Sequence, residues 1–252
     1  MMKVIGVMNR KGGVGKTTTV CNLAYWLASY GKRVLVVDLD GQGNATDCLR
    51  CGCYAETHGA ELGAAYAMEY PDMQAMELTG RTAVSPKVWL LTGGDGLFDL
   101  GDRLERVDAL HAFLHNEDNR KLFDFVVIDC PPEFNIAVLN AIEASDLLLI
   151  PTTDALASRK GAACVINELQ GGDYDVRVRA LPVMWSAKGA TGESMALLRE
   201  QLGCELAPAV ATWTKKAAEA DRLNKLLALY SPTCGASRAY RWVAQWLISG
   251  RS

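Results

Sequence analysis

The chain has 252 residues, of which 50% are hydrophobic and 22% are charged, and its formal net charge is −3. This composition excludes a disordered chain, and the length suits a single α/β domain spanning residues 1–252. A weakly acidic chain has no overall attraction for nucleic acid, so any DNA binding requires a local basic patch.

A glycine-rich turn follows the first predicted strand, residues 4–7, and precedes a predicted helix from about Thr17 to Tyr30. In such a turn, backbone N–H groups and the positive end of the helix converge on one spot, where they bind phosphate. The strict phosphate-loop pattern requires glycine at the position of Arg10, so this chain departs from it and carries an extra lysine in the loop. We expect a nucleotide to be held by Lys11, Gly12, Gly13, Val14, Gly15, Lys16, Thr17 and Thr18.

Two acidic residues end the second predicted strand. The unbroken apolar run 34–37 is typical of a strand buried on both faces of a parallel sheet, and Asp38 and Asp40 follow it. The carboxyl ends of parallel strands meet at one edge of the sheet, so both acids would lie beside the phosphate loop. Mg²⁺ and an attacking water molecule would occupy this position.

Three cysteines and one histidine come next in the chain: Cys48, Cys51, Cys53 and His58. Their spacing suggests a metal site, but a second pair of ligands at the usual distance is missing. We therefore expect reduced thiols here and keep a metal site as the alternative. Beyond them, the sequence predicts helices within residues 62–78, a strand at 88–92 and a helix at about 102–116.

A third motif begins at Phe125, where four apolar residues lead to Asp129 and then to Cys130-Pro131-Pro132. An acidic residue at the end of an apolar strand is the Walker B arrangement, in which the carboxylate binds Mg²⁺ directly or through water. Three motifs that each follow a strand predict a doubly wound, mostly parallel sheet flanked by helices, the P-loop NTPase fold.

The C-terminal part predicts a helix at 136–145, strands at 146–150, 176–184 and 206–212, and helices at 193–202 and 236–248. The last helix has one apolar side and no lysine-rich tail, so we expect it to pack on the sheet and not to anchor a membrane. The chain also has no apolar run that could span a bilayer and no secretory signal, which predicts a cytoplasmic protein.

The three motifs together resemble those of the ParA/MinD superfamily, whose phosphate loop is a deviant Walker A motif, and most closely its ParA-type partition ATPases. The resemblance continues near the C-terminus in Ala218-Glu219-Ala220, Leu229–Pro232 and Gly235-Ala236. It implies that Lys16 holds the β- and γ-phosphates and that Thr17 ligates Mg²⁺. Lys11 is the signature lysine, which in this family reaches the partner's phosphates across a nucleotide-bound dimer.

The second and third motifs also acquire roles from the resemblance. Asp40 would position the hydrolytic water, Asp38 would lie in the outer coordination sphere of Mg²⁺, and Asp129 would bind the ion. Gly41 replaces the proline of the ParA pattern, which would make this turn more flexible.

The implied function is a weak, partner-stimulated ATPase that dimerises on binding ATP and Mg²⁺ and drives plasmid or chromosome partition. It would bind DNA nonspecifically through Lys215 and Lys216, because lysines can contact phosphates but carry little sequence information. It would also associate with the nucleoid and respond to a ParB-like activator. For Lys215 and Lys216 the alternative is an ordinary solvated lysine pair. For the whole chain the alternatives are a ParA/MinD-like ATPase that positions a secretion, conjugation or membrane-associated system, and a scaffold that binds ATP without hydrolysing it.

Two segments depart from the ParA pattern. Residues 155–160, which face the dimer partner in the family, lack its acidic and aromatic residues, and Arg159 and Lys160 make the segment more basic. Trp185-Ser186-Ala187-Lys188 replaces the turn that in the family lies near the base or near the neighbouring subunit. The details of dimer contacts and of base recognition therefore do not transfer from the family.

Overall fold

The computed structural model describes residues 2–50, 63–172 and 174–250. These residues form an eight-stranded sheet in the order β3-β4-β2-β5-β1-β6-β7-β8. Every neighbouring pair is parallel except β3 and β4. The strands are β1 (Lys3–Val7), β2 (Val34–Asp38), β3 (Gly80–Thr82), β4 (Ser85–Leu91), β5 (Phe125–Asp129), β6 (Leu147–Thr152), β7 (Arg177–Trp185) and β8 (Ala211–Thr212).

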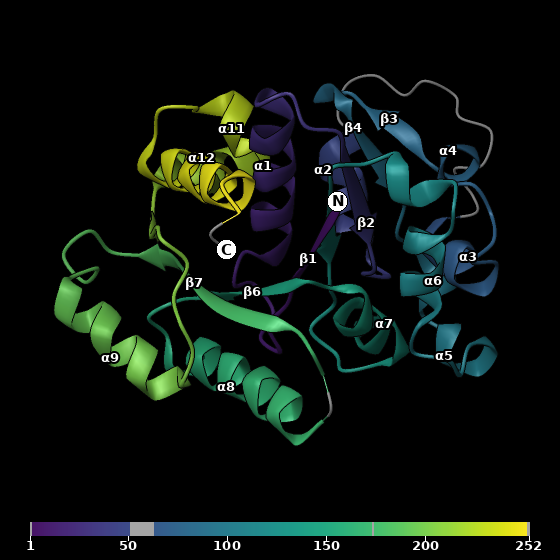
Figure 1. Ribbon diagram of the computed structural model, residues 1–252. Helices are drawn as coiled ribbons and strands as arrows, with labels where there is room; N and C mark the ends of the chain where they lie inside the picture. Colours follow the sequence, from purple (N-terminus) through teal and green to yellow (C-terminus); the bar gives the residue numbers. More distant parts are fainter. Residues whose placement is uncertain (1, 51–62, 173, 251–252) are drawn as a thin grey trace.

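Helices cover both faces of this sheet (Figure 1), so the predicted doubly wound, mostly parallel fold is confirmed. One face carries α1 (Lys16–Ser29), α2 (Asn44–Arg50), α10 (Lys215–Arg222), α11 (Leu227–Tyr230) and α12 (Gly235–Ile248). The other carries α3 (Gly63–Glu69), α4 (Ala75–Leu78), α5 (Leu100–Arg103), α6 (Ala109–His115), α7 (Ile136–Ala144), α8 (Leu156–Gly171) and α9 (Gly192–Leu202). Short 3₁₀ helices span Asp95–Leu97 and Asn119–Lys121.

The central strands alternate between the two hydrophobic cores. Val4 lies in the core beneath α6, α7 and α8, whereas its neighbour Ile5 lies in the core beneath α1 and α12. Because both faces of each strand are buried, the sequence shows continuous apolar runs here instead of polar–apolar alternation.

The predicted helix at 102–116 is wrong, because the chain leaves α5 after Arg103 and re-enters a helix at Ala109. Asn140 of α7 is buried in the gap, where its Oδ1 accepts from Leu110 N at 3.0 Å and its Nδ2 donates to Arg106 O at 3.0 Å.

The predicted strand at 206–212 is shorter in the structure, where it consists of a single bridge at Leu206 and the two residues of β8. Pro208 lies between them and has no N–H to donate to a neighbouring strand.

Strand register brings the predicted motifs to one edge of the sheet. Asp129 at the end of β5 is level with Val7 of β1 on one side and with Asp38 of β2 on the other. The phosphate loop, which leaves β1 one residue later, therefore lies beside both acids. Among the residues described, no helix is long and apolar enough to cross a membrane.

Candidate nucleotide-binding site

The phosphate loop turns from β1 into α1 through two glycines in the left-handed region. Gly13 has φ of 73° and Gly15 of 82°, and Gly15 is the N-cap of α1. Side chains are unfavourable at both positions, since only glycine adopts these angles without strain. A Cβ added to Gly12 or Gly13 would meet no atom within 4 Å, so the backbone at these two glycines is open to a ligand.

Asn9 fixes the start of the loop to the neighbouring elements. Its buried side chain donates from Nδ2 to Pro151 O at 2.9 Å and to Ser158 O at 3.2 Å, and its Oδ1 accepts from Lys11 N at 2.9 Å. Gly161 of α8 is close to this network, because a Cβ there would lie 3.0 Å from Lys11 N. The loop is thus held by β6 and by the first turns of α8.

Arg10 occupies the position at which the strict pattern has glycine. Its Nη1 pairs with Glu168 Oε1 of α8 at 3.0 Å, and its guanidinium carbon lies 5.7 Å from the centre of the Phe134 ring. The departure from the strict pattern therefore adds a second attachment of the loop to α8. Its neighbour Lys11 has an exposed side chain.

Lys16, Thr17 and Asp129 meet at the start of α1. Thr17 Oγ1 donates to Asp129 Oδ2 at 2.7 Å, and both Lys16 and Asp129 are buried. Asp129 Oδ1 is buried and has no hydrogen-bond partner among the residues that the structure describes. Burial and the nearby charge of Asp38 raise the pKa of Asp129 well above its usual range, against the opposing effects of Thr17 and Lys16. A buried carboxylate oxygen without a partner and a hydroxyl beside it fit a hard divalent cation such as Mg²⁺.

Asp38 is fully buried, and both of its oxygens already accept hydrogen bonds. Thr46 donates from N and from Oγ1 to Oδ2, each at 2.8 Å, and Asp40 N donates to Oδ1 at 3.1 Å. Burial raises the pKa of Asp38 while the bonds from Thr46 lower it. Asp38 therefore stabilises the turn through its hydrogen bonds to Asp40 and Thr46. Of the two carboxylates, it is Asp129 that keeps an oxygen, Oδ1, available for a cation.

Asp40 lies half-buried in the turn between β2 and α2. Its Oδ1 accepts from Gln42 N at 2.9 Å, and its carbonyl oxygen accepts from Gly43 N at 2.9 Å. Both bonds lie within the turn. The residue is half-buried at the same sheet edge as Asp129.

Lys215 and Lys216 begin α10 and lie apart from this cluster. Thr214 caps the helix by accepting from Lys216 N at 3.2 Å. Both lysines are exposed, but Lys216 Nζ pairs with Glu219 Oε2 at 2.9 Å, which raises the pKa of Lys216. The two residues predicted to bind DNA thus differ, because the carboxylate of Glu219 partly offsets the charge of Lys216.

Sequence reasoning missed three residues of the site. Asn9 and Thr46 stand inside the predicted motifs, but their polar contacts come from β6, α8 and β2, which no local pattern shows. Met184 of β7 has φ of 58°, and its Cε would lie 3.2 Å from a Cβ on Gly15. Nothing in the sequence marks Met184, because its position over the loop depends on the order of the strands.

Three of the four residues of the cysteine–histidine group, Cys51, Cys53 and His58, lie outside the described residues. Within the described ranges, no group of three or more His, Cys, Asp or Glu side chains could hold a metal. Cys48 is partly buried, and its hydrogen bond with the Cys21 thiol lowers its pKa. Cys130 is fully buried in the core, as expected for a packing role, and burial raises its pKa.

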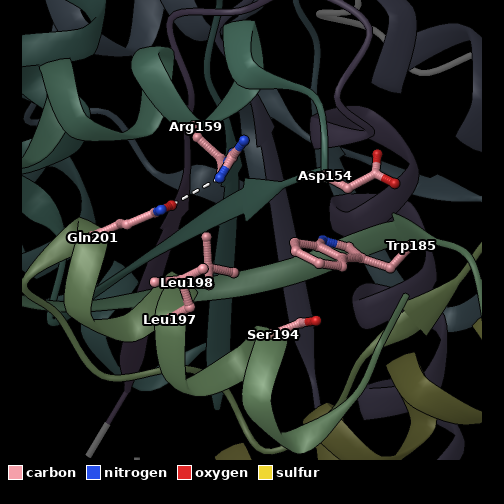
Figure 2. Close-up of a pocket in the computed structure, with 7 residues that line it drawn as sticks. All are labelled: Asp154, Arg159, Trp185, Ser194, Leu197, Leu198 and Gln201. Carbon is pink, nitrogen blue, oxygen red and sulfur yellow. Dashed lines mark hydrogen bonds between the residues drawn. The ribbon is translucent and has the colours of Figure 1, made fainter. Parts of the chain in front are cut away.

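A separate hollow of about 240 Å³ lies between α8, α9 and the ends of β6 and β7. Figure 2 shows Arg159 and Gln201 on one side of it and Trp185 on the other, with Leu198 between them. Arg159 Nη1 donates to Gln201 Oε1 at 2.8 Å, and Trp185 Nε1 donates to Thr152 O at 3.0 Å. Arg159, one of the two basic residues noted in the sequence, is thus engaged with α9, whereas Lys160 is exposed.

The fold and the site together define a P-loop nucleoside triphosphatase. A glycine-rich loop at the start of a helix, a threonine and two buried aspartates at the ends of adjacent strands are brought to one sheet edge. A family model described as an AAA domain matches residues 2–173. The chain belongs to the ParA/MinD family of P-loop ATPases, as its relatives show.

Two relatives match nearly the whole chain. The chromosome partitioning protein ParA of Caulobacter vibrioides is 30% identical over 98% of this chain and 94% of its own length. The chromosome-partitioning ATPase Soj of Thermus thermophilus is 33% identical over 97% of this chain and 95% of its own. A structure of the septum site-determining protein MinD of Pyrococcus horikoshii with Mg-ADP has a TM-score of 0.74 at 19% identity, and the match covers 100% of this chain and 98% of that one.

Proposed function

We propose that this chain is a ParA-type partition ATPase that binds ATP and Mg²⁺, closes into a dimer, holds DNA nonspecifically and releases it after hydrolysis. The observation that carries the proposal is the cluster at the start of α1. There, Thr17 is bonded to Asp129, and the second oxygen of Asp129 is buried without a partner. The partition role is supported by the names of two relatives that match nearly the whole chain.

Binding would depend on the loop and the first turn of α1. The amides of Gly12, Gly13 and Gly15 and the charge of Lys16 hold the phosphates, in a loop that Asn9 keeps in shape. Thr17 and Asp129 would hold Mg²⁺, which would supply positive charge to offset that of the phosphates. Asp38 keeps the adjoining turn folded through Thr46.

Hydrolysis would depend on Asp40 and Lys11. Asp40, which is accessible at the same edge, orients the attacking water. The exposed Lys11 reaches the phosphates of a second copy of the chain, so that the site is complete only in the dimer. This division predicts slow turnover by the chain alone and faster turnover when a ParB-like activator stabilises the closed arrangement.

DNA binding would use the exposed lysines at the start of α10 and phosphate contacts alone, which predicts strong dependence on salt. Such a protein would associate with the nucleoid in the cytoplasm. The cargo would be a plasmid or chromosome, by analogy with the partition proteins that this chain resembles.

The test is a DNA mobility shift with ATP, with ADP and without nucleotide, at low and at moderate salt. We expect a shift with ATP only, and its loss in the Lys215→Ala/Lys216→Ala variant, which should still bind ATP. The Asp40→Ala variant should bind ATP and shift DNA but release no phosphate. The proposal is wrong if ATP produces no shift at low salt. Phosphate release without DNA binding, or ATP-dependent sedimentation with vesicles, would instead indicate a positioning ATPase of another kind.

A further inference from the structure

The ring of Phe98 lies against the backbone of Gly41, the residue that follows Asp40. A Cβ built on Gly41 would lie 2.6, 2.7 and 2.9 Å from the ring atoms Cε1, Cζ and Cδ1 of Phe98. Non-bonded carbon atoms are most stable at about 3.5–4.0 Å, so no side chain fits there while the ring stays in place. Gly41 is not among the glycines with positive φ. A side chain at this position would therefore have to displace the ring, whereas the backbone angles of Gly41 would accept one.

The same two loops touch at a second point. A Cβ on Gly93 would lie 2.6 Å from Asp40 O and 2.8 Å from Asp38 Cγ. Thr46 Oγ1, which donates to Asp38, also accepts from Gly93 N at 2.9 Å. The segment from Gly93 to Phe98, which we call the 93–98 wall, thus supports the turn from Asp38 to Gly41 at both of its ends.

Phe98 is not a core residue, because 65% of it is exposed. Its removal would therefore leave no large buried cavity, and the contact with Gly41 would be lost. The hydrogen bonds of Asp40 to Gln42 and Gly43 lie within the turn itself, so they shape the turn without fixing it to the rest of the site. Leu39 N donates to Asp129 O at 2.9 Å, which ties the start of this turn to β5. Beyond that bond, Asp38 supports the turn from one side and the 93–98 wall supports it from another.

We propose that Phe98 is a positioning residue for Asp40, and that Gly41 and Phe98 act as a pair. The ring limits the sideways movement of the turn, and the glycine provides the space that the ring occupies. A proline at position 41, as in the ParA pattern, would carry a Cβ into the ring. The proposal rests on the proposed function only where it assigns the hydrolytic water to Asp40.

The first experiment needs no nucleotide. Amide hydrogen exchange of a peptide covering residues 38–46 reports how firmly the turn is held. We expect Phe98→Ala and Gly41→Ala each to increase exchange in this peptide, and the double variant to exchange no faster than Phe98→Ala alone. Phe98→Tyr, which keeps the ring, should match the wild type. The matched control is Trp242→Ala on α12, an aromatic residue that is 62% exposed and far from the site in sequence.

The second experiment measures steady-state hydrolysis with Mg²⁺ over a range of ATP concentrations. Misplacement of a catalytic group by about 1 Å can cost about 100-fold, so we expect kcat to fall by about 10- to 100-fold in Phe98→Ala and in Gly41→Ala. KM for ATP should stay close to the wild-type value, since the phosphate loop is untouched. In the double variant Gly41→Ala/Phe98→Ala, the ring with which the Cβ added at position 41 would clash is absent. This variant should therefore be no slower than Phe98→Ala.

Three outcomes would overturn the proposal: wild-type exchange and turnover in Phe98→Ala, losses that multiply in the double variant, or a rise in KM without a fall in kcat. A failure of the proposed function looks different. In that case the wild type and Asp40→Ala release phosphate equally, while the exchange experiment still decides whether Phe98 and Gly41 act as a pair.

Discussion

Thr17 Oγ1 donates a hydrogen bond of 2.7 Å to Asp129 Oδ2, although 112 positions separate the two residues in the chain. The bond joins the first turn of α1 to the end of β5 and uses one oxygen of the carboxylate. The other oxygen, Oδ1, is buried and has no partner within the described part of the chain. A cation that enters this site finds a carboxylate already oriented, so little of the binding free energy is spent on ordering the side chain.

Replacement of Thr17 by alanine is expected to damage both binding and stability. Asp129 would then have both oxygens buried and unpaired, and an unsatisfied buried polar group costs about 1–3 kcal/mol. We therefore expect a lower free energy of unfolding in urea without ligand and a loss of Mg²⁺-dependent ATP binding in calorimetry. Thr17→Ser keeps the hydroxyl and should retain both; equal damage in Thr17→Ser would show that the methyl group matters and not the hydrogen bond.

Replacement of Asp129 by asparagine should separate stability from ligand binding. The buried carboxylate is held beside Asp38, and both burial and that charge disfavour ionisation of Asp129. An uncharged amide of the same shape relieves this repulsion, so the ligand-free variant should unfold at the same or a higher urea concentration than the wild type at pH 7.

The same variant should lose the stabilisation that ATP and Mg²⁺ provide. A ligand present at 100 times its Kd stabilises the native state by about 2.7 kcal/mol, which thermal unfolding resolves easily. The expected result is a shift of the unfolding midpoint with Mg²⁺ and ATP in the wild type and none in Asp129→Asn. A midpoint that still rises in the variant would remove Asp129 from the cation site.

The attachment of the phosphate loop to α8 can be tested at Gly161. A Cβ there would meet Asn9 Oδ1 and Lys11 N, and both belong to a network that can hardly move. We expect Gly161→Ala to weaken ATP binding about 10-fold or more through displacement of the loop, an effect of about 1.4 kcal/mol. Gly171→Ala is the matched control, because a Cβ at Gly171, on the last turn of the same helix, meets nothing within 4 Å.

The sequence predicted those parts of the fold and site that depend on local pattern. Apolar runs that end in Asp38 and Asp129 marked buried parallel strands, and the glycine loop marked the edge where they meet. The break between α5 and α6 could not be predicted, because it depends on Asn140, which comes from another helix. The contact of Phe98 with Gly41 likewise depends on the order of β4 and β2 in the sheet.

Some features were accessible to local reasoning but were not predicted. Lys216 and Glu219 are three positions apart on one helix, a spacing at which opposite charges pair. The Arg10–Glu168 pair, by contrast, joins residues 158 positions apart and follows only from the placement of α8. Motifs therefore locate a site of this kind, whereas the residues that hold its loops in place require the structure.

The ion pair of Arg33 and Asp124 predicts a dependence of stability on pH. Asp124 accepts from Arg33 Nη2 at 3.0 Å and from Arg33 N at 2.8 Å, and the bonds from Arg33 lower the pKa of Asp124. A carboxyl group whose pKa is lowered by folding stabilises the native state above its unfolded pKa of about 3.9. This contribution is lost as the pH falls through the folded pKa.

Urea unfolding of the wild type and Asp124→Asn from pH 7 to pH 3 would measure this effect. Both side chains are more than one-third exposed, so the difference at pH 7 should be no more than about 1 kcal/mol. It should begin to shrink below about pH 3.9, where Asp124 becomes protonated in the unfolded chain, and it should be smaller at pH 3 than at pH 7. A difference that is constant with pH would show that the ion pair contributes nothing and that the substitution acts through shape.

The pairing of Lys216 with Glu219 predicts that the two lysines at the start of α10 contribute unequally to DNA binding. Glu219 Oε2 accepts from Lys216 Nζ at 2.9 Å and from the Tyr230 hydroxyl at 3.0 Å, so a negative charge is held beside Lys216. Lys215 is exposed and is not paired in this way with Glu219. We expect Lys215→Ala to weaken ATP-dependent DNA binding more than Lys216→Ala.

Glu219→Gln should strengthen DNA binding, because it removes the competing carboxylate and leaves Lys216 free to contact phosphate. Each lysine that contacts a phosphate changes the slope of log K against log salt by about 1, so Lys215→Ala should reduce the slope and Glu219→Gln should increase it. Lys121→Ala is the matched control, because this exposed lysine lies just before β5, at the opposite edge of the sheet. Equal effects of all three lysine variants would mean that DNA responds to net charge and not to this surface.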